Sequence, residues 1–135
     1  MDMSAESIGR KKSVLIVDDE PLLARSVSRY LQRFGFDTVV CDAGSPALEQ
    51  MTSRLFDIVI TDLELPDMHG SRLIQHVEKT YTACRIVVIS GHNTAPPALN
   101  IYKSLNISYL NKPFDLDHLL DHVRGTPPPA PEEGC

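Results

Sequence analysis

Apolar residues along the chain gather into short runs that alternate with longer segments of helical spacing. Five runs rich in Val, Ile and Leu predict strands at 13–17, 37–41, 57–61, 85–90 and 107–110. The first, third and fourth runs are nearly all apolar, which is typical of strands covered on both faces. The pattern therefore favours a parallel sheet flanked by helices over a half-exposed antiparallel sheet.

The segments between these runs carry the period of amphipathic helices. The clearest helix follows Pro21, a residue that suits a first helical turn, and repeats apolar side chains at Leu22, Leu23, Val27, Tyr30, Leu31 and Phe34. Further helices are expected at 46–54, 71–79, 97–104 and 116–124. This alternation predicts an α/β fold with five βα units, a doubly wound five-stranded parallel sheet joined by right-handed crossovers.

Composition and charge narrow the class of protein. The 135 residues, 42% of them hydrophobic, suffice for one globular domain with its own core. Thirteen basic and eighteen acidic residues give a net charge of −5, which argues against direct nucleic-acid binding. The longest apolar runs are far shorter than the roughly 20 residues of a membrane span, and residues 1–12 do not resemble a secretory signal. We therefore expect a cytoplasmic protein without a membrane segment.

The cysteines and the chain ends refine this picture. Cys41, Cys84 and Cys135 are odd in number and lack zinc-ligand spacing, so reduced thiols are expected. Residues 125–135 contain four prolines followed by two glutamates, a composition that favours extended chain. We expect a flexible extension at 1–11, one domain at 12–124, and a proline-rich tail or truncated linker at 125–135.

Polar residues stand where the predicted strands end. Asp18 and Asp19 follow the first strand, Asp62 follows the third, Ser90 ends the fourth, and Lys112 lies just beyond the fifth. The carboxyl ends of parallel strands form the ligand-binding edge of such sheets, so these side chains should converge. Two unit charges 4 Å apart repel by about 4 kcal/mol at an effective dielectric constant near 20, so three carboxylates imply a bound cation. Carboxylate oxygens suit Mg²⁺, and Lys112 adds a fixed positive charge.

Four stretches, each ending an expected strand, carry a resemblance to a known family. They are Val-Leu-Ile-Val-Asp-Asp-Glu-Pro at 14–21, Asp-Ile-Val-Ile-Thr-Asp-Leu-Glu-Leu-Pro-Asp-Met-His-Gly at 57–70, Ile-Ser-Gly at 89–91, and Tyr-Leu-Asn-Lys-Pro-Phe at 109–114. In this order they resemble the receiver domain of two-component response regulators, of the chemotaxis-receiver type, over residues 12–124. The resemblance implies a flavodoxin-like sheet with strand order 2-1-3-4-5.

The resemblance also implies a phosphoacceptor chemistry. Asp62 would accept a phosphoryl group from a sensor histidine kinase, a phosphotransfer protein or a small acyl phosphate. Asp18 and Asp19 would hold Mg²⁺, together with a carboxylate oxygen of Asp62 and the backbone carbonyl of Glu64. Lys112 would neutralise a phosphoryl oxygen, and the chain would show no enzymatic activity beyond self-phosphorylation and self-dephosphorylation.

A switch is implied by the same resemblance. The Ser90 hydroxyl would move to a phosphoryl oxygen, and this movement would vacate space for Tyr109. The change would reach partners, or a second copy of the chain, through the helix at 97–104, the strand at 107–110 and the helix at 116–124; Tyr102, Tyr109 and His118 lie on these elements. A fused or separate effector could receive the signal.

Two other functions stay open. A haloacid-dehalogenase-like phosphatase also combines an Asp nucleophile, Mg²⁺ and Lys on a parallel sheet, but it carries Asp-x-Asp after its first strand. The second alternative is a receiver-like interaction module that is never phosphorylated. For single residues, Ser90 could bond only local backbone, and the spacing of His118 and His122 could bind zinc but is more typical of a solvated helix face.

Overall fold

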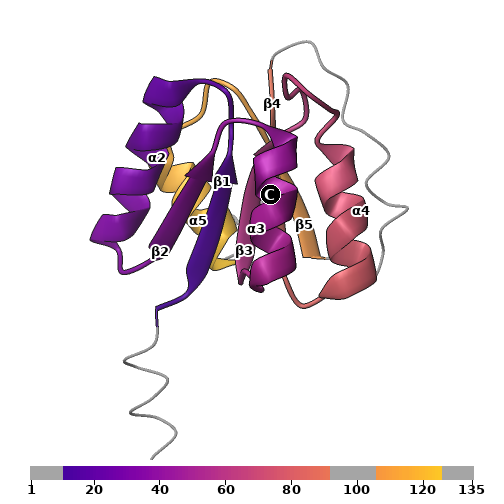
Figure 1. Cartoon of the computed structure of the whole chain (residues 1–135). Helices are drawn as coiled ribbons and strands as arrows, with labels where there is room; N and C mark the ends of the chain where they lie inside the picture. Colours follow the sequence, from indigo (N-terminus) through magenta and orange to yellow (C-terminus); the bar gives the residue numbers. More distant parts are fainter. Residues whose placement is uncertain (1–10, 92–105, 126–135) are drawn as a thin grey trace, which may run out of the picture.

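The computed structural model describes residues 11–91 and 106–125, which form one α/β layer structure (Figure 1). Its sheet has five parallel strands in the order β2-β1-β3-β4-β5. The strands are β1 (Ser13–Val17), β2 (Asp37–Cys41), β3 (Ile58–Asp62), β4 (Arg85–Ser90) and β5 (Asn106–Asn111). The described helices are α2 (Pro21–Arg33), α3 (Gly44–Ser53), α4 (Ser71–Thr80) and α5 (Leu116–Arg124).

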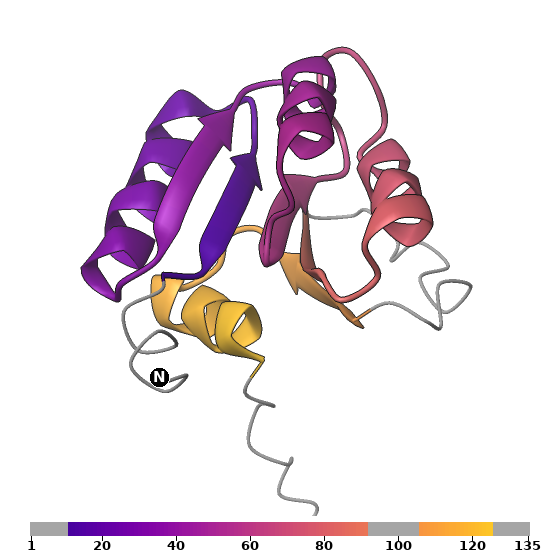
Figure 2. The same cartoon turned by 60° about the horizontal axis from the view of Figure 1, so that its bottom comes forward.

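Helices cover both faces of the sheet, and the sequence pattern explains why. Figure 2 shows α2 and α5 on the side of the sheet opposite α3 and α4. Alternate residues of β1, β3 and β4 point to opposite faces, so each strand feeds two apolar clusters. One cluster packs the sheet against α3 and α4 and includes Leu15, Val59, Ile86, Met51 and Leu73. The other packs it against α2 and α5 and includes Ile16, Ile60, Val87, Leu31 and Leu119.

The predicted fold class and strand order are confirmed, with small shifts at element ends. β3 runs one residue later than expected, from Ile58 to Asp62, and Asp62 still pairs with Ile89 of β4. α3 begins at Gly44, ahead of Pro46, and β5 extends by one residue at each end. The helix expected at 97–104, with Tyr102, lies outside the described residues.

The fold brings the ends of β1, β3, β4 and β5 to one edge of the sheet. β1 and β3 are neighbours in the middle of the sheet, and both strands are buried throughout. The carboxyl ends of these strands are therefore held by a packed core, which suits this edge to positioning a site.

No helix within 11–91 and 106–125 has the length and apolar character needed to cross a bilayer.

Candidate functional site

Three carboxylates meet at the carboxyl edge of the sheet. Asp18 follows β1 directly, Asp19 is the next residue, and Asp62 is the last residue of β3. One carboxylate oxygen from each lies within 4.8 Å of the other two. Asp18 is 4% exposed and Asp62 6% exposed, whereas Asp19 is exposed to solvent. The predicted convergence of these three residues is therefore present in the structure.

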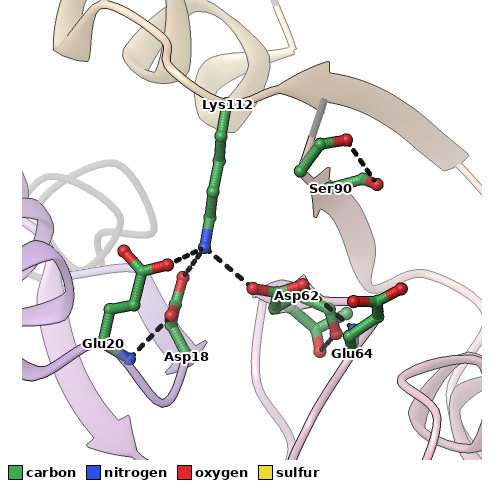
Figure 3. Close-up of polar contacts among 8 residues, drawn as sticks. Asp18, Glu20, Asp62, Glu64, Ser90 and Lys112 are labelled. Carbon is green, nitrogen blue, oxygen red and sulfur yellow. Dashed lines mark hydrogen bonds and ion pairs between the residues drawn. The ribbon is translucent and has the colours of Figure 1, made fainter. Parts of the chain in front are cut away.

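Lys112, just beyond β5, places its ammonium among these acids (Figure 3). Its Nζ lies 2.8 Å from Asp62 Oδ2, 3.1 Å from Asp18 Oδ2 and 3.0 Å from Glu20 Oε2. Burial alone would lower the pKa of Lys112, but hydrogen bonds to Asp62 and Glu20 and the attraction of Asp18 outweigh it and raise the pKa well above its usual range. Lys112 is therefore a permanent cation of the site.

Asp18 is the most buried of the three clustered acids. Burial raises its pKa, and the hydrogen bond from the Glu20 amide and the attraction of Lys112 oppose that rise. Its Oδ1 accepts the Glu20 N–H at 2.9 Å. Its buried Oδ2 accepts no hydrogen bond of good geometry from the described residues and has the Lys112 ammonium 3.1 Å away as an ion-pair partner. This oxygen has the capacity to bind a further cation.

The loop after β3 fixes Asp62. Its Oδ1 accepts the Glu64 N–H at 3.0 Å while Oδ2 accepts from Lys112. Gly70 closes the loop by donating its N–H to the Leu63 carbonyl at 2.7 Å. A Cβ at Gly70 would stand 2.2 Å from the Asp62 carbonyl oxygen, so only glycine allows this approach. Both ends of the loop therefore hold the carboxylate in place.

The residues present fit a divalent cation. The acidic triad is the one group of three metal-ligating side chains found among the described residues. Within hydrogen-bond distance it is balanced by a single lysine, and its oxygens are the hard ligands that Mg²⁺ and Ca²⁺ prefer. The chemistry of the donor set and the incompletely bonded Asp18 Oδ2 both agree with the sequence-based expectation of a cation.

Ser90 and Tyr109, the predicted switch pair, lie on the neighbouring strands β4 and β5. Ser90 is 1% exposed at the end of β4, and its Oγ donates to the Gly91 carbonyl at 3.3 Å, the local bond considered from the sequence. Tyr109 stands opposite Val88 in the β4–β5 register and packs partly buried against the core on the α3 and α4 side. Both occupy the strands expected of a switch pair, and their movement stays a prediction.

Sequence reasoning missed two acids at this edge. Glu20 pairs with Lys112, and its position directly after the Asp18–Asp19 pair was the available signal. Asp67 accepts hydrogen bonds from the backbone of α3, from residues that are 22 and 23 positions away in the sequence. No motif or spacing near Asp67 predicts this contact. Glu20 thus joins the ion-pair network of Lys112, whereas Asp67 ties the loop after β3 to α3.

Comparison with known proteins agrees with the fold and the acidic edge. Residues 14–124 match the family model described as the response regulator receiver domain. The chain belongs to this family. Receiver domains are phosphoacceptors of two-component signalling, they partner with histidine kinases, and they are generally non-enzymatic apart from self-phosphorylation chemistry.

Individual relatives place the receiver domain in larger proteins. The chain is 27% identical over 111 residues to the DNA-binding transcriptional regulator NtrC of Proteus hauseri, which matches 82% of this chain and 24% of NtrC. A response regulator of Burkholderia pseudomallei, solved with a phosphorylated aspartic acid, calcium ion and citrate, has a TM-score of 0.72 and 25% identity, covering 84% of this chain and 66% of that one. The beryllofluoride-activated NtrC4 receiver domain dimer has a TM-score of 0.75 and 25% identity. The match covers 84% of this chain and 93% of the NtrC4 chain.

Proposed function

We propose that Asp62 is the phosphoacceptor of this receiver domain. The observation that carries the proposal is the place of its carboxylate, buried at the end of β3, 2.8 Å from the Lys112 ammonium and within 4.8 Å of carboxylate oxygens of Asp18 and Asp19. Asp62 differs from the other two acids in its contact with Lys112: its Oδ2 accepts a hydrogen bond from the ammonium at 2.8 Å, whereas Asp18 Oδ2 has Lys112 only as an ion-pair partner and Asp19 is exposed. A phosphorylated aspartic acid in the Burkholderia pseudomallei relative supports the same chemistry.

The reaction is an in-line displacement at phosphorus. A carboxylate oxygen of Asp62 forms a bond to phosphorus as the P–N bond of a phosphohistidine donor breaks, and the departing imidazole takes up a proton. Lys112 already contacts Asp62, so its ammonium is placed to neutralise a phosphoryl oxygen as the acyl phosphate forms. Slow hydrolysis of the acyl phosphate returns the carboxylate.

We assign the cation as Mg²⁺. The carboxylates of Asp18, Asp19 and Asp62 and the backbone carbonyl of Glu64 would hold it. When bound, Mg²⁺ supplies positive charge to the phosphoryl oxygens and helps to orient the donor. The calcium ion in the Burkholderia pseudomallei structure supports a divalent ion in this class of site.

Phosphorylation then changes a partner surface. To reach a phosphoryl oxygen, the Ser90 hydroxyl must give up its bond to the Gly91 carbonyl, a neutral hydrogen bond with a net contribution of about 1 kcal/mol. That cost is small beside the charge-assisted bonds that a phosphoryl group would offer. Tyr109 would turn toward the vacated space, and the change would reach the surface around β5 and α5.

Partners and chain organisation follow as parts of the proposal. The donor would be a sensor histidine kinase or a phosphotransfer protein. A homodimer would form through the β5 and α5 side; that the NtrC4 receiver domain was solved as a dimer supports dimerisation itself. The chain spans about a quarter of the length of NtrC, ZraR and GlrR, so a fused effector is one output and a separate target the other. The domain limits of 12–124, with flanks at 1–11 and 125–135, and the cytoplasmic location stay predictions.

Intact-mass analysis after incubation with acetyl phosphate tests the proposed function. We expect one phosphoryl group on the wild-type chain with Mg²⁺, none after chelation, and none on Asp62→Asn with Mg²⁺. Steady turnover of a phosphate ester would favour the phosphatase alternative. A folded wild-type chain without an adduct would favour the unphosphorylated interaction module.

A further inference from the structure

The exposed loop between β3 and α4 is tied to the start of α3. Asp67 Oδ1 accepts the Gly44 N–H and Oδ2 accepts the Ser45 N–H, each at 2.8 Å. Ala43, the residue at the N-cap of α3, offers no side-chain cap. The two hydrogen bonds from α3 also lower the pKa of Asp67, so the carboxylate is ionised at neutral pH. Asp67 thus supplies from a distant loop the cap that α3 lacks locally.

Asp67 stands at the tip of a short hairpin. Glu64 and His69 form an antiparallel bridge, and the Leu65 N–H donates to the Met68 carbonyl at 3.2 Å. Pro66 and Asp67 therefore occupy the turn between these residues. The tip carries the tie to α3, and the first arm of the hairpin carries Glu64.

A second contact beside the tip strengthens the tie. A Cβ at Gly44 would stand 2.4 Å from both Cγ and Sδ of Met68, so the backbone of α3 approaches this side chain closely. Hydrogen bonds and apolar packing thus act on adjacent residues of the hairpin. With two separate contacts, the hairpin has little freedom to slide or rotate on α3.

The base of the hairpin is fixed to the acceptor. The Glu64 N–H bonds Asp62 Oδ1 at 3.0 Å, and Gly70 closes the loop against Leu63 at 2.7 Å. Glu64 therefore lies between two anchors, the acceptor carboxylate on one side and α3 on the other. A displacement of the tip would be transmitted to the backbone of Glu64 through the bridge to His69.

We propose that Asp67 is a positioning residue for the cation and acceptor site. By capping α3 it fixes the hairpin, which orients the Glu64 carbonyl toward the cation, and it couples cation binding to the first turn of α3. This inference rests on the proposed function for the role of the Glu64 carbonyl. Coupling of this kind is reciprocal, so a cation that orders the hairpin also strengthens the cap.

The test compares Asp67→Ala and Asp67→Asn with wild type by Mg²⁺ calorimetry and by NMR hydrogen exchange of the Gly44 and Ser45 amides. Residues that orient metal ligands typically change affinity 10- to 100-fold, so we expect Asp67→Ala to weaken Mg²⁺ binding about tenfold. Asp67→Asn keeps one acceptor oxygen, so its Mg²⁺ affinity should lie between those of wild type and Asp67→Ala. In wild type, Mg²⁺ should slow exchange at both amides, and in Asp67→Ala this response should disappear.

Met51→Ala serves as the matched control. It weakens the packing of α3 at a buried position and leaves Asp67 with its hydrogen bonds. If it reduces Mg²⁺ affinity as much as Asp67→Ala does, the effect comes from loss of stability, and the proposal is wrong. Unchanged Mg²⁺ affinity in Asp67→Ala would overturn it as well.

Failure of the proposed function gives a different result. A wild-type chain that binds no Mg²⁺ overturns both the cation assignment and the role of Asp67. Normal Mg²⁺ binding with the expected loss in Asp67→Ala, but without a phosphoryl adduct, would retain the role of Asp67 in cation binding and reject the phosphoacceptor.

Discussion

Lys112→Met is expected to lower the free energy of unfolding by about 3 kcal/mol in the absence of divalent cations, because it leaves two buried carboxylates without their counter-ion. Lys112 Nζ contacts Asp62 Oδ2 at 2.8 Å and Asp18 Oδ2 at 3.1 Å, and both acids are less than a tenth exposed. Methionine fills a similar volume but brings no charge. The bridge to Glu20 should contribute little, because that carboxylate is mostly in solvent.

Urea denaturation at neutral pH in EDTA, and again with Mg²⁺, measures this effect. Mg²⁺ should stabilise Lys112→Met more than it stabilises wild type, since the cation replaces part of the missing charge. Lys79→Met, at an exposed position of α4, is the control and should change stability by no more than about 0.5 kcal/mol. Equal losses in the two variants would show that Lys112 does not neutralise the acids.

Asp18→Asn is expected to have opposite effects on stability and on cation binding. Burial raises the pKa of Asp18 above its ordinary value of 3.8, so the folded state favours the protonated carboxyl more than the unfolded chain does. The stability that this group contributes is present below pH 3.8 and is lost as pH rises through the raised pKa of the folded state. Asparagine stays neutral, so the variant should be more stable than wild type at neutral pH without Mg²⁺.

Urea denaturation over a series of pH values in EDTA tests whether Asp18→Asn is more stable than wild type. The difference in the free energy of unfolding between Asp18→Asn and wild type should become smaller as pH falls through the folded-state pKa of Asp18. Below pH 3.8 the difference should vanish. Mg²⁺ affinity should fall on the order of a hundredfold, because each carboxylate within about 4 Å contributes several kcal/mol at an effective dielectric constant near 20 before desolvation is subtracted. Glu49→Gln, at an exposed position of α3, is the control and should change neither the stability nor the Mg²⁺ affinity. An Asp18→Asn variant that is less stable than wild type and still binds Mg²⁺ normally would contradict both expectations.

The covered parallel sheet and the acidic edge could be predicted because they depend on patterns that hold locally, whereas the strand order was predicted from the family resemblance. Apolar runs such as Val14–Val17 are buried on both faces, which excludes most sheets other than a covered parallel one. The carboxyl end of each strand then fixes where Asp18, Asp62 and Lys112 must lie. Among the described residues, only the ends of elements differ from the prediction, as in β3, which begins at Ile58 and not at Asp57.

The rest depends on contacts that sequence spacing does not encode. The ion pair of Glu20 with Lys112 joins residues 92 positions apart, and the cap that Asp67 places on α3 requires both elements to be docked first. Ser90 shows the same limit. Its residue type and place fit a switch, yet in this structure its hydroxyl bonds the adjacent backbone carbonyl.

Borohydride reduction followed by peptide mapping identifies the phosphorylated residue. Reduction cleaves an aspartyl phosphate and leaves homoserine at the modified position, so the method reports the residue as well as the modification. After treatment with acetyl phosphate and Mg²⁺, the account predicts homoserine at position 62 and at no other aspartate. Homoserine at position 18 or 19, or a phosphoryl group stable to borohydride, would contradict it.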